Sequence, residues 1–577
     1  MGKKIPIGIE FYKEMVDKDY YYVDKTLLIK DILDAGTKVS LFTRPRRFGK
    51  TLSLMTLRTF FEDERDWYGN KVDNCRYFEG KKISLCGEEY LAKQGAFPVI
   101  SLTFKSAKQP EFGMAYAALV DSIAEEFRRH QYICEGGVLE EDEINRFRQI
   151  IRWGADEKNR DGEMVSVISL TYATALAFLS RCLKKYHGRN VIILIDEYDV
   201  PLENSYFSGF YDRMAEFIRS LFESALKTND ALEFAVVTGC LRISKESIFT
   251  GLNNLEVISV LNQGYAEYFG FLGEEVREML RHFSLEEKEE ELKKWYDGYL
   301  FGNTEVYNPW SVLNYVKGAA VYHEKTPKPY WANTSSNSIV RELVDGAGRD
   351  TRKELDELIA GGTIEKPVHE DITYGDIFSS QDNLWNFLFF TGYLKKVGER
   401  FYFDRTYITL AIPNHEISYI YNNTILLWFD TKVKTLDRSR FYKALICGDS
   451  SVVEEELKRE LVECISFYDA AEQFYHGFMV GMLGGLGEYL LRSNREAGNG
   501  RPDILMVPED ECGTVLIFEL KHVEKYNRME SGCDAALFQI KEKQYDIECR
   551  EDGFTKFIKY GICFYKKSCR VKSVIEG

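Results

Sequence analysis

The chain has 577 residues, a length that suggests three or four domains, and its 45% hydrophobic content can fill several buried cores. Its formal net charge of −16 repels nucleic acid, so any DNA contact must come from a local basic patch. The 12 cysteines form no CxxC pair or zinc-spaced cluster, and neither a signal segment nor a run of ~20 apolar residues is present. We therefore expect a cytoplasmic protein with reduced cysteines and no membrane partner.

The first informative stretch is Arg44–Leu52, with the sequence RPRRFGKTL. It follows a short apolar strand, Val39–Phe42, and leads into a predicted helix, Leu52–Arg58. Strand, Gly-Lys-Thr loop and helix form the context of a phosphate-binding loop, because N–H groups at a helix N-terminus bind anions. The loop departs from GxxxxGK[ST] in having Arg44 at the first position. The alternative is a basic turn before an ordinary helix.

If the loop binds ATP, Lys50 reaches the outer phosphates and the Thr51 hydroxyl helps to hold Mg²⁺. We predict that the rest of the loop also lines the nucleotide site, through Arg46, Arg47, Phe48, Gly49 and Leu52. Upstream, Tyr22 precedes a predicted helix at Leu27–Asp34 and is a candidate for stacking on the base. A simply packed N-terminal helix is the alternative.

A second buried strand is predicted at Phe97–Phe104, and a helical region at Met114–Arg181. Val191–Glu197 then reads as a central parallel strand that ends in two carboxylates, where open α/β sheets bind ligands. Asp196 is predicted to join the Mg²⁺ shell, and Glu197 to polarise the attacking water. The pair could merely cap the next helix, but the preceding Gly-Lys-Thr loop favours nucleotide binding.

Leu232–Gly239 is a further predicted core strand. Thr238 at its end is a candidate sensor of the γ-phosphate, and Arg242 a candidate source of positive charge. Ordinary strand-end roles are equally open for both residues. Two helices predicted within Gly264–Tyr299, and another beginning at Asn308-Pro309, indicate a helical lid after the core.

A winged-helix-like unit is predicted from Trp385 to Pro413. Its helix is followed by a hairpin with a turn at Gly398–Arg400 and then by a strand at Ile408–Pro413. Winged helices bind DNA or proteins, but the region is not strongly basic, so an internal structural role is also open.

The pattern changes after Tyr442, where helices give way to strands. Beyond three helices, the predicted elements are strands at Tyr489–Ser493, Gly500–Val507 and Thr514–Lys521, a helix at Cys533–Tyr545, and a closing strand at Phe557–Phe564.

A second group of polar residues lies on two of these strands, which a short turn joins. Asp503 is on the first, and Glu519 and Lys521 share one face of the second. Carboxylate oxygens suit Mg²⁺ or Mn²⁺, which could generate hydroxide for phosphodiester hydrolysis, while Lys521 positions water or stabilises charge. Glu472, on the preceding helix, is predicted to complete the metal shell. The alternative is a strand-end salt bridge.

Four basic residues near the C-terminus form a local patch where DNA would need it, or a merely solvated edge. They are Lys566, Lys567, Arg570 and Lys572.

Together these motifs resemble a prokaryotic family that joins an AAA-ATPase-like region to a C-terminal PD-(D/E)XK nuclease-like domain. The resemblance covers nearly the whole chain and rests on Tyr22–Thr26, Arg44–Thr51, Ile195–Asp199, Thr238-Gly239, Trp295–Tyr299, Tyr307–Pro309, Ile412–Asn414, Arg501–Asp503 and Glu519–Lys521. It implies ATP binding and a metal-dependent nuclease site. It also implies that the RPRRFGKT form of the loop is usual, so Arg44 departs only from the general pattern.

The expected fold class is α/β. We predict an AAA-like P-loop NTPase core with a helical lid and a winged-helix-like region, followed by an α+β restriction-endonuclease-like domain. The predicted boundaries are 1–260 for the ATPase core, 261–345 for the lid, 346–440 for the winged-helix-like region and 441–577 for the nuclease-like domain.

Three functional hypotheses remain at this point. The first is an ATP-dependent or ATP-regulated DNA-cleaving protein in defence or mobile-element biology. The second is an ATP-dependent switch or scaffold whose nuclease-like domain binds nucleic acid or protein without cutting. The third, a nuclease with an inactive ATPase region, is disfavoured by Lys50, Thr51, Asp196 and Glu197. A homo-oligomer is one open alternative, because AAA-type assemblies often act through an arginine from a neighbouring subunit, but the sequence does not identify that arginine or the oligomeric state.

Overall fold

The computed structural model describes most of the chain: residues 3–156, 170–241, 248–249, 252–324, 326–331, 349–368, 380–423, 438–464, 472–484, 486, 489–493, 502–508, 510 and 513–577. The chain divides into two compact units. One comprises Met1–Ser335 with Glu365–Ile417, and the other Ser336–Ile364 with Ser418–Gly577. The finer division into four domains stays a prediction.

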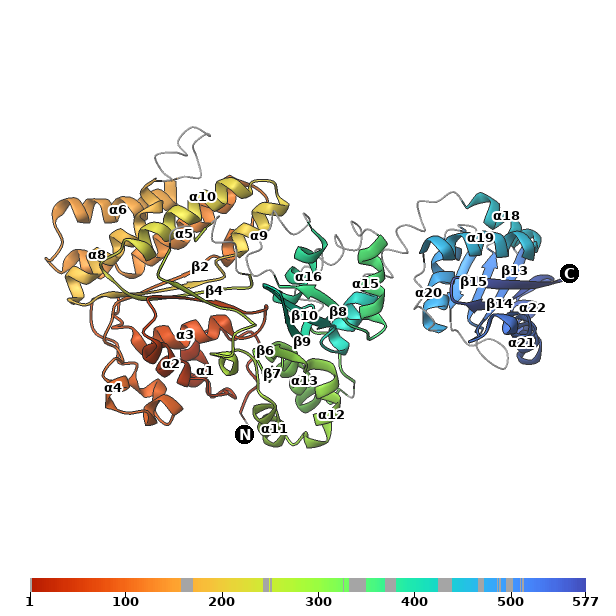
Figure 1. Cartoon of the computed structure of the whole chain (residues 1–577), viewed down its shortest axis with the longest axis horizontal. Coiled ribbons are helices and arrows are strands. Elements are labelled where there is room, and N and C mark those ends of the chain that lie inside the picture. The colour runs from red at the N-terminus through yellow and green to blue at the C-terminus, as the bar shows by residue number, and fades with distance from the viewer. Residues whose placement is uncertain are drawn as a thin grey trace. The chain divides into compact units, whose positions relative to one another are not determined.

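The core of the first unit is a five-stranded parallel sheet in the order β2-β3-β4-β1-β5 (Figure 1). Its strands are β1 (Val39–Thr43), β2 (Val99–Thr103), β3 (Val191–Asp196), β4 (Leu232–Gly239) and β5 (Leu255–Ile258). Every residue of β1 and β3 is buried, because helices cover both faces of the sheet. The predicted strands of the phosphate loop and of the Asp-Glu pair are therefore confirmed, as is the predicted parallel α/β core.

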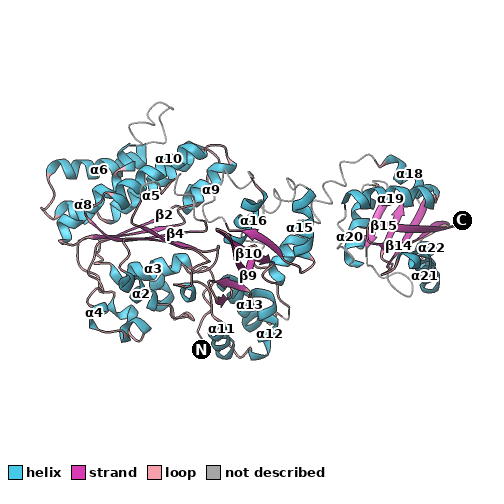
Figure 2. Cartoon of the chain, viewed as in Figure 1, coloured by secondary structure: helices cyan, strands magenta, loops and turns pink. Residues whose placement is uncertain are grey.

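Two groups of helices cover this sheet, as Figure 2 shows. On one side lie α1 (Tyr12–Asp17), α2 (Leu27–Ala35), α3 (Lys50–Phe61) and α4 (Glu88–Leu91). On the other side lie α5 (Phe112–Arg129), α6 (Glu141–Asp156), α8 (Ala175–His187), α9 (Val200–Phe207) and α10 (Tyr211–Phe222).

A helical segment with a small hairpin follows the sheet. It consists of α11 (Gly273–His282), α12 (Glu289–Tyr296), β6 (Tyr299–Phe301), β7 (Thr304–Val306) and α13 (Pro309–Tyr322). The predicted start of α13 is confirmed: the Asn308 side chain accepts hydrogen bonds from the amides of Trp310 (3.0 Å) and Ser311 (3.3 Å), and Pro309 is the first helical residue.

The wing of the predicted winged-helix-like region is a three-stranded sheet in the order β8-β10-β9. The strands are β8 (Ile364–Pro367), β9 (Lys395–Tyr402) and β10 (Arg405–Ala411), and the helix α16 (Gln381–Phe390) precedes β9. The turn predicted at Gly398–Arg400 is wrong, because the chain turns at Phe403-Asp404. Gly398 instead pairs with Thr409, beside a register shift, and glycine within a strand commonly marks such an irregularity.

The second unit contains a five-stranded sheet in sequential order. Its strands are β11 (Tyr489–Ser493), β12 (Ile504–Pro508), β13 (Thr514–His522), β14 (Lys556–Tyr565) and β15 (Ser568–Glu576). Only β13 and β14 pair in parallel; the other neighbours are antiparallel. The helices are α15 (Arg349–Ile359), α18 (Ser439–Cys447), α19 (Ser450–Cys464), α20 (Glu472–Leu483), α21 (Met529–Lys543) and α22 (Ile547–Glu551).

Alternation along β13 gives this sheet two separate cores. Leu516, Phe518 and Leu520 pack with buried residues of α18, α19 and α20. Val515 and Ile517 face the other way and pack with residues of α21 and α22. The predicted α+β character of the C-terminal region is therefore confirmed.

The prediction that the unit closes at Phe564 is wrong, because β15 follows and pairs with β14 along its length. Two of the four basic residues expected to form a patch there are paired with acidic residues. Arg570 forms an ion pair with Glu454 (3.1 Å), and Lys572 forms one with Asp534 (2.6 Å).

Candidate functional site

The loop after β1 ends at the first turn of α3, at the carboxyl edge of the sheet. Gly49 precedes the helix with φ +84°, a left-handed conformation that glycine adopts readily. Arg47 is also left-handed, with φ +73°. The tight turn presents the first N–H groups of a 12-residue helix, which lack partners within the helix and attract anions.

Lys50 is buried in the loop, where its ammonium group donates to the backbone oxygens of Arg44 and Pro45, both at 2.9 Å. The thiol of Cys240, which follows β4, lies 3.7 Å from the same nitrogen. Carbonyl oxygens therefore hold the ammonium group at the loop. A phosphate placed there would offer it a stronger, charge-assisted acceptor.

Arg44, the departure from the glycine pattern, points into the protein. Its guanidinium is fully buried, donates to the backbone oxygens of Thr43 and Ile258 at 2.9 Å, and lies 5.1 Å from the ring centre of Phe301. Burial lowers the pKa of this arginine to about 9. Arg44 thus fastens the loop to β5 and to the hairpin β6–β7 rather than facing the space where a phosphate would bind.

Asp196, at the end of β3, is held by two threonines. Thr51 donates to its Oδ2 at 2.6 Å, and Thr238 donates to its Oδ1 at 2.5 Å. The loop threonine and the strand-end aspartate therefore meet, as a P-loop magnesium site requires. Thr238 therefore helps to orient Asp196, and its role as a sensor of the γ-phosphate stays a prediction.

Glu197 follows with φ +53°, an uncommon conformation for a residue other than glycine. Burial, and then the neighbouring Asp196, raises the pKa of its carboxyl group. A carboxylate with a raised pKa accepts a proton more readily near neutral pH, which suits a group that activates water.

Asp199, which completes the Asp-Glu-Tyr-Asp run, was not predicted as a site residue. One of its oxygens accepts from the amides of Cys240 (2.7 Å) and Leu241 (3.1 Å). A Cβ at Gly239 would lie 2.5 Å from the Tyr198 ring, which is too close, so only glycine fits at this position. Asp199 and Tyr198 thereby fix the path of the chain after β4.

The other predicted loop residues mostly contact protein. Arg46 forms an ion pair with Glu203, and Arg47 lies 4.2 Å from the ring centre of Trp310. Phe48 is fully buried and packs edge-on against Tyr299. Arg242 lies outside the described residues.

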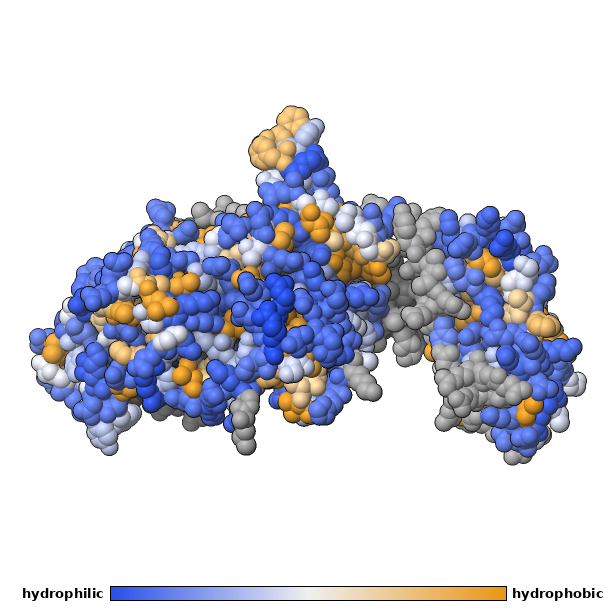
Figure 3. All heavy atoms as spheres, turned by 90° about the horizontal axis from the view of Figure 1, so that it is seen from below, coloured by the Kyte–Doolittle hydropathy of each residue, from blue (hydrophilic) through white to orange (hydrophobic). Residues whose placement is uncertain are grey.

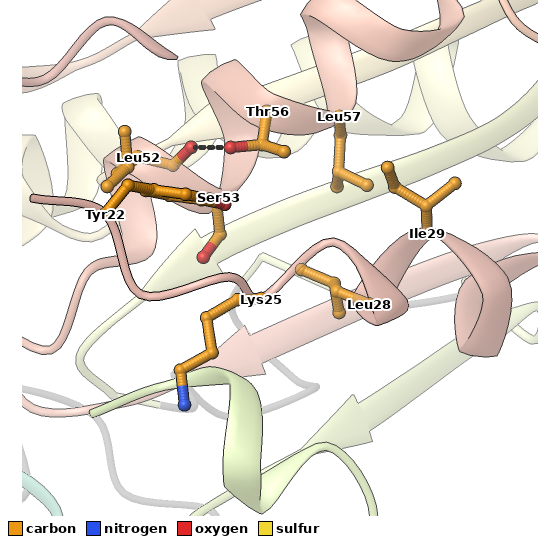
Figure 4. Close-up of a pocket in the computed structure, with 8 residues that line it drawn as sticks. All are labelled: Tyr22, Lys25, Leu28, Ile29, Leu52, Ser53, Thr56 and Leu57. Atoms are coloured by element: carbon orange, nitrogen blue, oxygen red, sulfur yellow. Dashed lines mark hydrogen bonds between the residues drawn. The ribbon is translucent and has the colours of Figure 1, made fainter. Parts of the chain in front are cut away.

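A small cavity of about 30 Å³ lies beside the first turns of α3, between α2 and Tyr22 (Figure 4). Leu52, predicted as nucleotide-binding, lines it. Lys25 points away from the other lining side chains, and its ammonium group pairs with Glu275 at 2.6 Å. The cavity has room for about one water and not for a purine ring. The position of Tyr22 in this structure therefore fits packing, and base stacking by Tyr22 stays a prediction.

The second predicted group comes together at the ends of β12 and β13. One carboxylate oxygen of Asp503 accepts from the amide of Leu520 at 2.7 Å. The ammonium group of Lys521 donates to Glu519 at 3.0 Å and to the side-chain oxygen of Gln539, on α21, at 2.8 Å. Gln539 in turn donates to the hydroxyl of Tyr545 at 3.2 Å.

Glu519 is the least satisfied member of this group. It is 2% exposed, and its Oε2 accepts no hydrogen bond from the described residues. Burial, and then the charge of Asp503, raises the pKa of Glu519 to about 7. A buried carboxylate without a full set of partners is unfavourable unless a cation or a proton balances its charge.

Two carboxylates with an unpartnered oxygen fit a hard divalent cation such as Mg²⁺. The side chain of Glu472, the predicted third ligand, is not described, although α20 begins at this residue. Within the described ranges, no group of three or more His, Cys, Asp or Glu side chains could hold a metal ion. His476, one turn along α20, was not predicted as a site residue; its Nε2 lies 3.0 Å from the backbone oxygen of Asp503.

None of the described helices combines the length and the apolar character needed to cross a membrane. Comparison with known proteins gives two family matches. Residues 6–249 match the family described as predicted AAA-ATPase, and residues 470–574 match the PD-(D/E)XK nuclease superfamily.

The chain is also similar along nearly its whole length to a protein of Azotobacter chroococcum mcd 1, described as an uncharacterized protein in the vnfD 5' region. The two are 25% identical over 578 residues, covering 96% of this chain and 94% of the relative. The order of motifs, the two sheets and the family matches agree: this chain joins an AAA-ATPase-like domain to a PD-(D/E)XK nuclease superfamily domain.

Proposed function

We propose that the first unit binds ATP with Mg²⁺ at the loop 44–52 and hydrolyses it. The contact of Thr51 with Asp196 at the N-terminus of α3 is the main support. The phosphates would lie against the first N–H groups of α3, and the Lys50 ammonium group would exchange its loop carbonyls for phosphate oxygens. Glu197 would accept the proton of the attacking water. Bound Mg²⁺ would neutralise charge on the β- and γ-phosphates.

We further propose that the second unit cleaves DNA with Mg²⁺ or Mn²⁺ at Asp503 and Glu519, under the control of the ATP site. The unpartnered, buried oxygen of Glu519 beside Asp503 is the observation that carries this proposal. The ion would supply an activated water and stabilise the leaving oxygen. Lys521, steadied by Gln539, would place its ammonium group near the charge that develops on the phosphate. Glu472 would add a third carboxylate.

The second candidate function is an ATP-dependent switch or scaffold whose nuclease-like domain binds nucleic acid or protein without cutting. The ion pairs of Arg570 and Lys572 with acidic residues favour it, because they reduce the positive charge available to DNA.

A cleavage panel separates the two functions. Full-length protein is incubated with single-stranded DNA, duplex DNA and RNA, with Mg²⁺ or Mn²⁺, and with or without ATP. We expect wild-type protein to cut DNA only with a divalent ion, and ATP to change the rate. Failure of the wild type to cut any substrate, in a preparation that binds ATP, would favour the switch or scaffold.

A further inference from the structure

The tip of the hairpin β9–β10 carries three consecutive exposed aromatic residues. Phe401 is 71% exposed, Tyr402 52% and Phe403 82%. The pairing of Tyr402 with Arg405 leaves only Phe403 and Asp404 in the turn. In Figure 3 the hairpin projects at the top of the view, with apolar side chains at its end. We call Phe401–Phe403 the aromatic tip.

The backbone at the aromatic tip is unfavourable for the residue that occupies it. Phe403 has φ +53°, in the left-handed region that two-residue hairpin turns usually fill with Gly, Asn or Asp. A bulky residue there is an outlier. Burial does not offset this strain, because most of the Phe403 side chain faces solvent. The fold itself therefore gives no reason for an aromatic residue at this position, which points to a contact with a partner.

The neighbouring side chains hold the aromatic tip in a defined arrangement. The rings of Tyr402 and Phe403 meet edge to face, with their centres 4.5 Å apart. The Arg400 guanidinium lies 5.1 Å from the ring centres of both Tyr402 and Tyr407, and is anchored by two hydrogen bonds to Glu365 on β8. The rings of Tyr402, Phe403 and Tyr407 are thus partly ordered before any partner binds.

The charge of the hairpin favours a nucleic acid as this partner. Residues 395–405 contain four basic and two acidic side chains, although the whole chain has a net charge of −16. Lys396 pairs with Glu399 and Arg400 with Glu365, so Lys395 and Arg405 supply the positive charge available to a phosphate. A protein partner needs about 800 Å² of surface on each side, far more than a two-residue turn offers. A single aromatic ring, in contrast, is enough to stack on one unpaired base, and nearby arginines contact phosphates.

We propose that the aromatic tip binds nucleic acid by stacking on unpaired bases, with Arg405 directed toward the adjacent phosphate. This inference rests on the proposed DNA-cleaving function, and it assigns the first unit a direct role in holding the strand. The proposal also makes nucleic acid the partner of the winged-helix-like region, whose modest charge alone does not show what it binds.

The test is fluorescence anisotropy with a labelled single-stranded DNA of roughly 20 nucleotides, longer than the site of one binding fold. EDTA prevents cleavage during the measurement. The double variant F401A/F403A removes two exposed rings and leaves the core intact. The matched control is W67A/Y68A, which removes two side chains that are 74% and 86% exposed elsewhere in the same unit. Thermal unfolding checks that both variants are folded.

We expect F401A/F403A to bind the single strand at least about tenfold more weakly than wild type, and W67A/Y68A to bind within about twofold. Unchanged affinity in F401A/F403A, while wild type binds and cuts DNA, would overturn the proposal that the aromatic tip binds DNA. The proposed nuclease function would still stand. An equal loss on duplex DNA would overturn stacking on unpaired bases. If wild type neither binds nor cuts DNA, the proposed nuclease function fails as well.

Discussion

The two candidate sites both lie at strand ends, but their polar groups are satisfied to different degrees. In the ATPase-like domain, Lys50 rests on two carbonyl oxygens and Asp196 accepts from two threonines. In the nuclease-like domain, Glu519 keeps an oxygen without a partner, and burial beside Asp503 raises its pKa to about 7. The first group is arranged before any ligand binds, whereas the second keeps a buried carboxylate oxygen that has no hydrogen-bond partner among the described residues.

This difference suggests how each site depends on its ligand. At the loop, a bound nucleotide would replace contacts that already exist, so its loss should leave the fold nearly unchanged. At Asp503 and Glu519, a cation would relieve repulsion between two carboxylates, so its presence should stabilise the domain itself. The predictions below test this difference, from the largest expected effect to the smallest.

The largest effect is expected for D503A, which removes a carboxylate from the candidate metal site. DNA cleavage should fall by at least about a thousandfold, because metal-assisted charge stabilisation is worth several kcal/mol. ATP affinity should be unchanged. Gel-based cleavage rates and nucleotide titration measure the two quantities. D552A, at an exposed aspartate of the same unit, is the control; equal cleavage by D503A and D552A would remove Asp503 from the site.

A second large effect is expected for K50A, which removes the buried ammonium group from the loop. ATP affinity should fall at least about a hundredfold, because charged hydrogen bonds to phosphate are lost. Calorimetric titration of the protein with ATP, in the presence of Mg²⁺, measures this affinity. K30A, at a partly exposed lysine of α2 that pairs with Asp34, should bind ATP like wild type. Normal ATP affinity in K50A would refute the phosphate-loop interpretation.

An intermediate effect concerns the pH dependence of stability. The folded state keeps a proton on Glu519 up to about pH 7, whereas an unfolded glutamate releases it near 4.5. The folded chain therefore binds more protons in this window, and this group's contribution to stability falls as pH rises from about 4.5 to 7.

E519Q removes this titration, so its loss of stability over that window should be smaller than that of wild type by about 3 kcal/mol. Denaturant unfolding at several pH values, without metal, provides the comparison. E551Q, at an exposed glutamate of α22, serves as control. Parallel pH profiles for wild type and E519Q would show that burial does not perturb Glu519.

The smallest effect is expected for T238V, which keeps the shape of the side chain and removes one hydrogen bond to Asp196. ATP hydrolysis with Mg²⁺ should slow by about tenfold or less, since such a bond contributes roughly 1 kcal/mol. T59V alters another buried threonine, whose hydroxyl only bonds the backbone of its own helix. An equal rate of ATP hydrolysis in T238V and T59V would show that Thr238 does not contribute to hydrolysis.

Much of the fold could be predicted because the central strands consist of apolar runs. Val39–Phe42 and Val191–Ile195 are buried on both faces and carry no competing helical pattern. The strand β5 was missed because it is a short edge strand, and Glu256 interrupts its apolar pattern. The turn was misplaced because Gly398 is a stronger turn signal than Phe403.

The candidate sites were predictable to different extents for a related reason. Lys50, Thr51 and Asp196 follow from local motifs, and Asp503, Glu519 and Lys521 follow from the spacing of strands. The tertiary contacts of these residues could not be predicted in this way. The buried direction of Arg44, the hydrogen bond from Thr238 to Asp196, and the approach of Gln539 to Lys521 depend on elements far away in the sequence.

The central claim is that Asp503 and Glu519 form a divalent-cation site distinct from the nucleotide site. Titration of the nucleotide-free protein with Mn²⁺, followed by electron paramagnetic resonance of the free ion, tests it directly. We predict that wild type and K50A bind Mn²⁺ with equal affinity, and that D503A loses this binding. Equal Mn²⁺ affinity in wild type and D503A would contradict the claim.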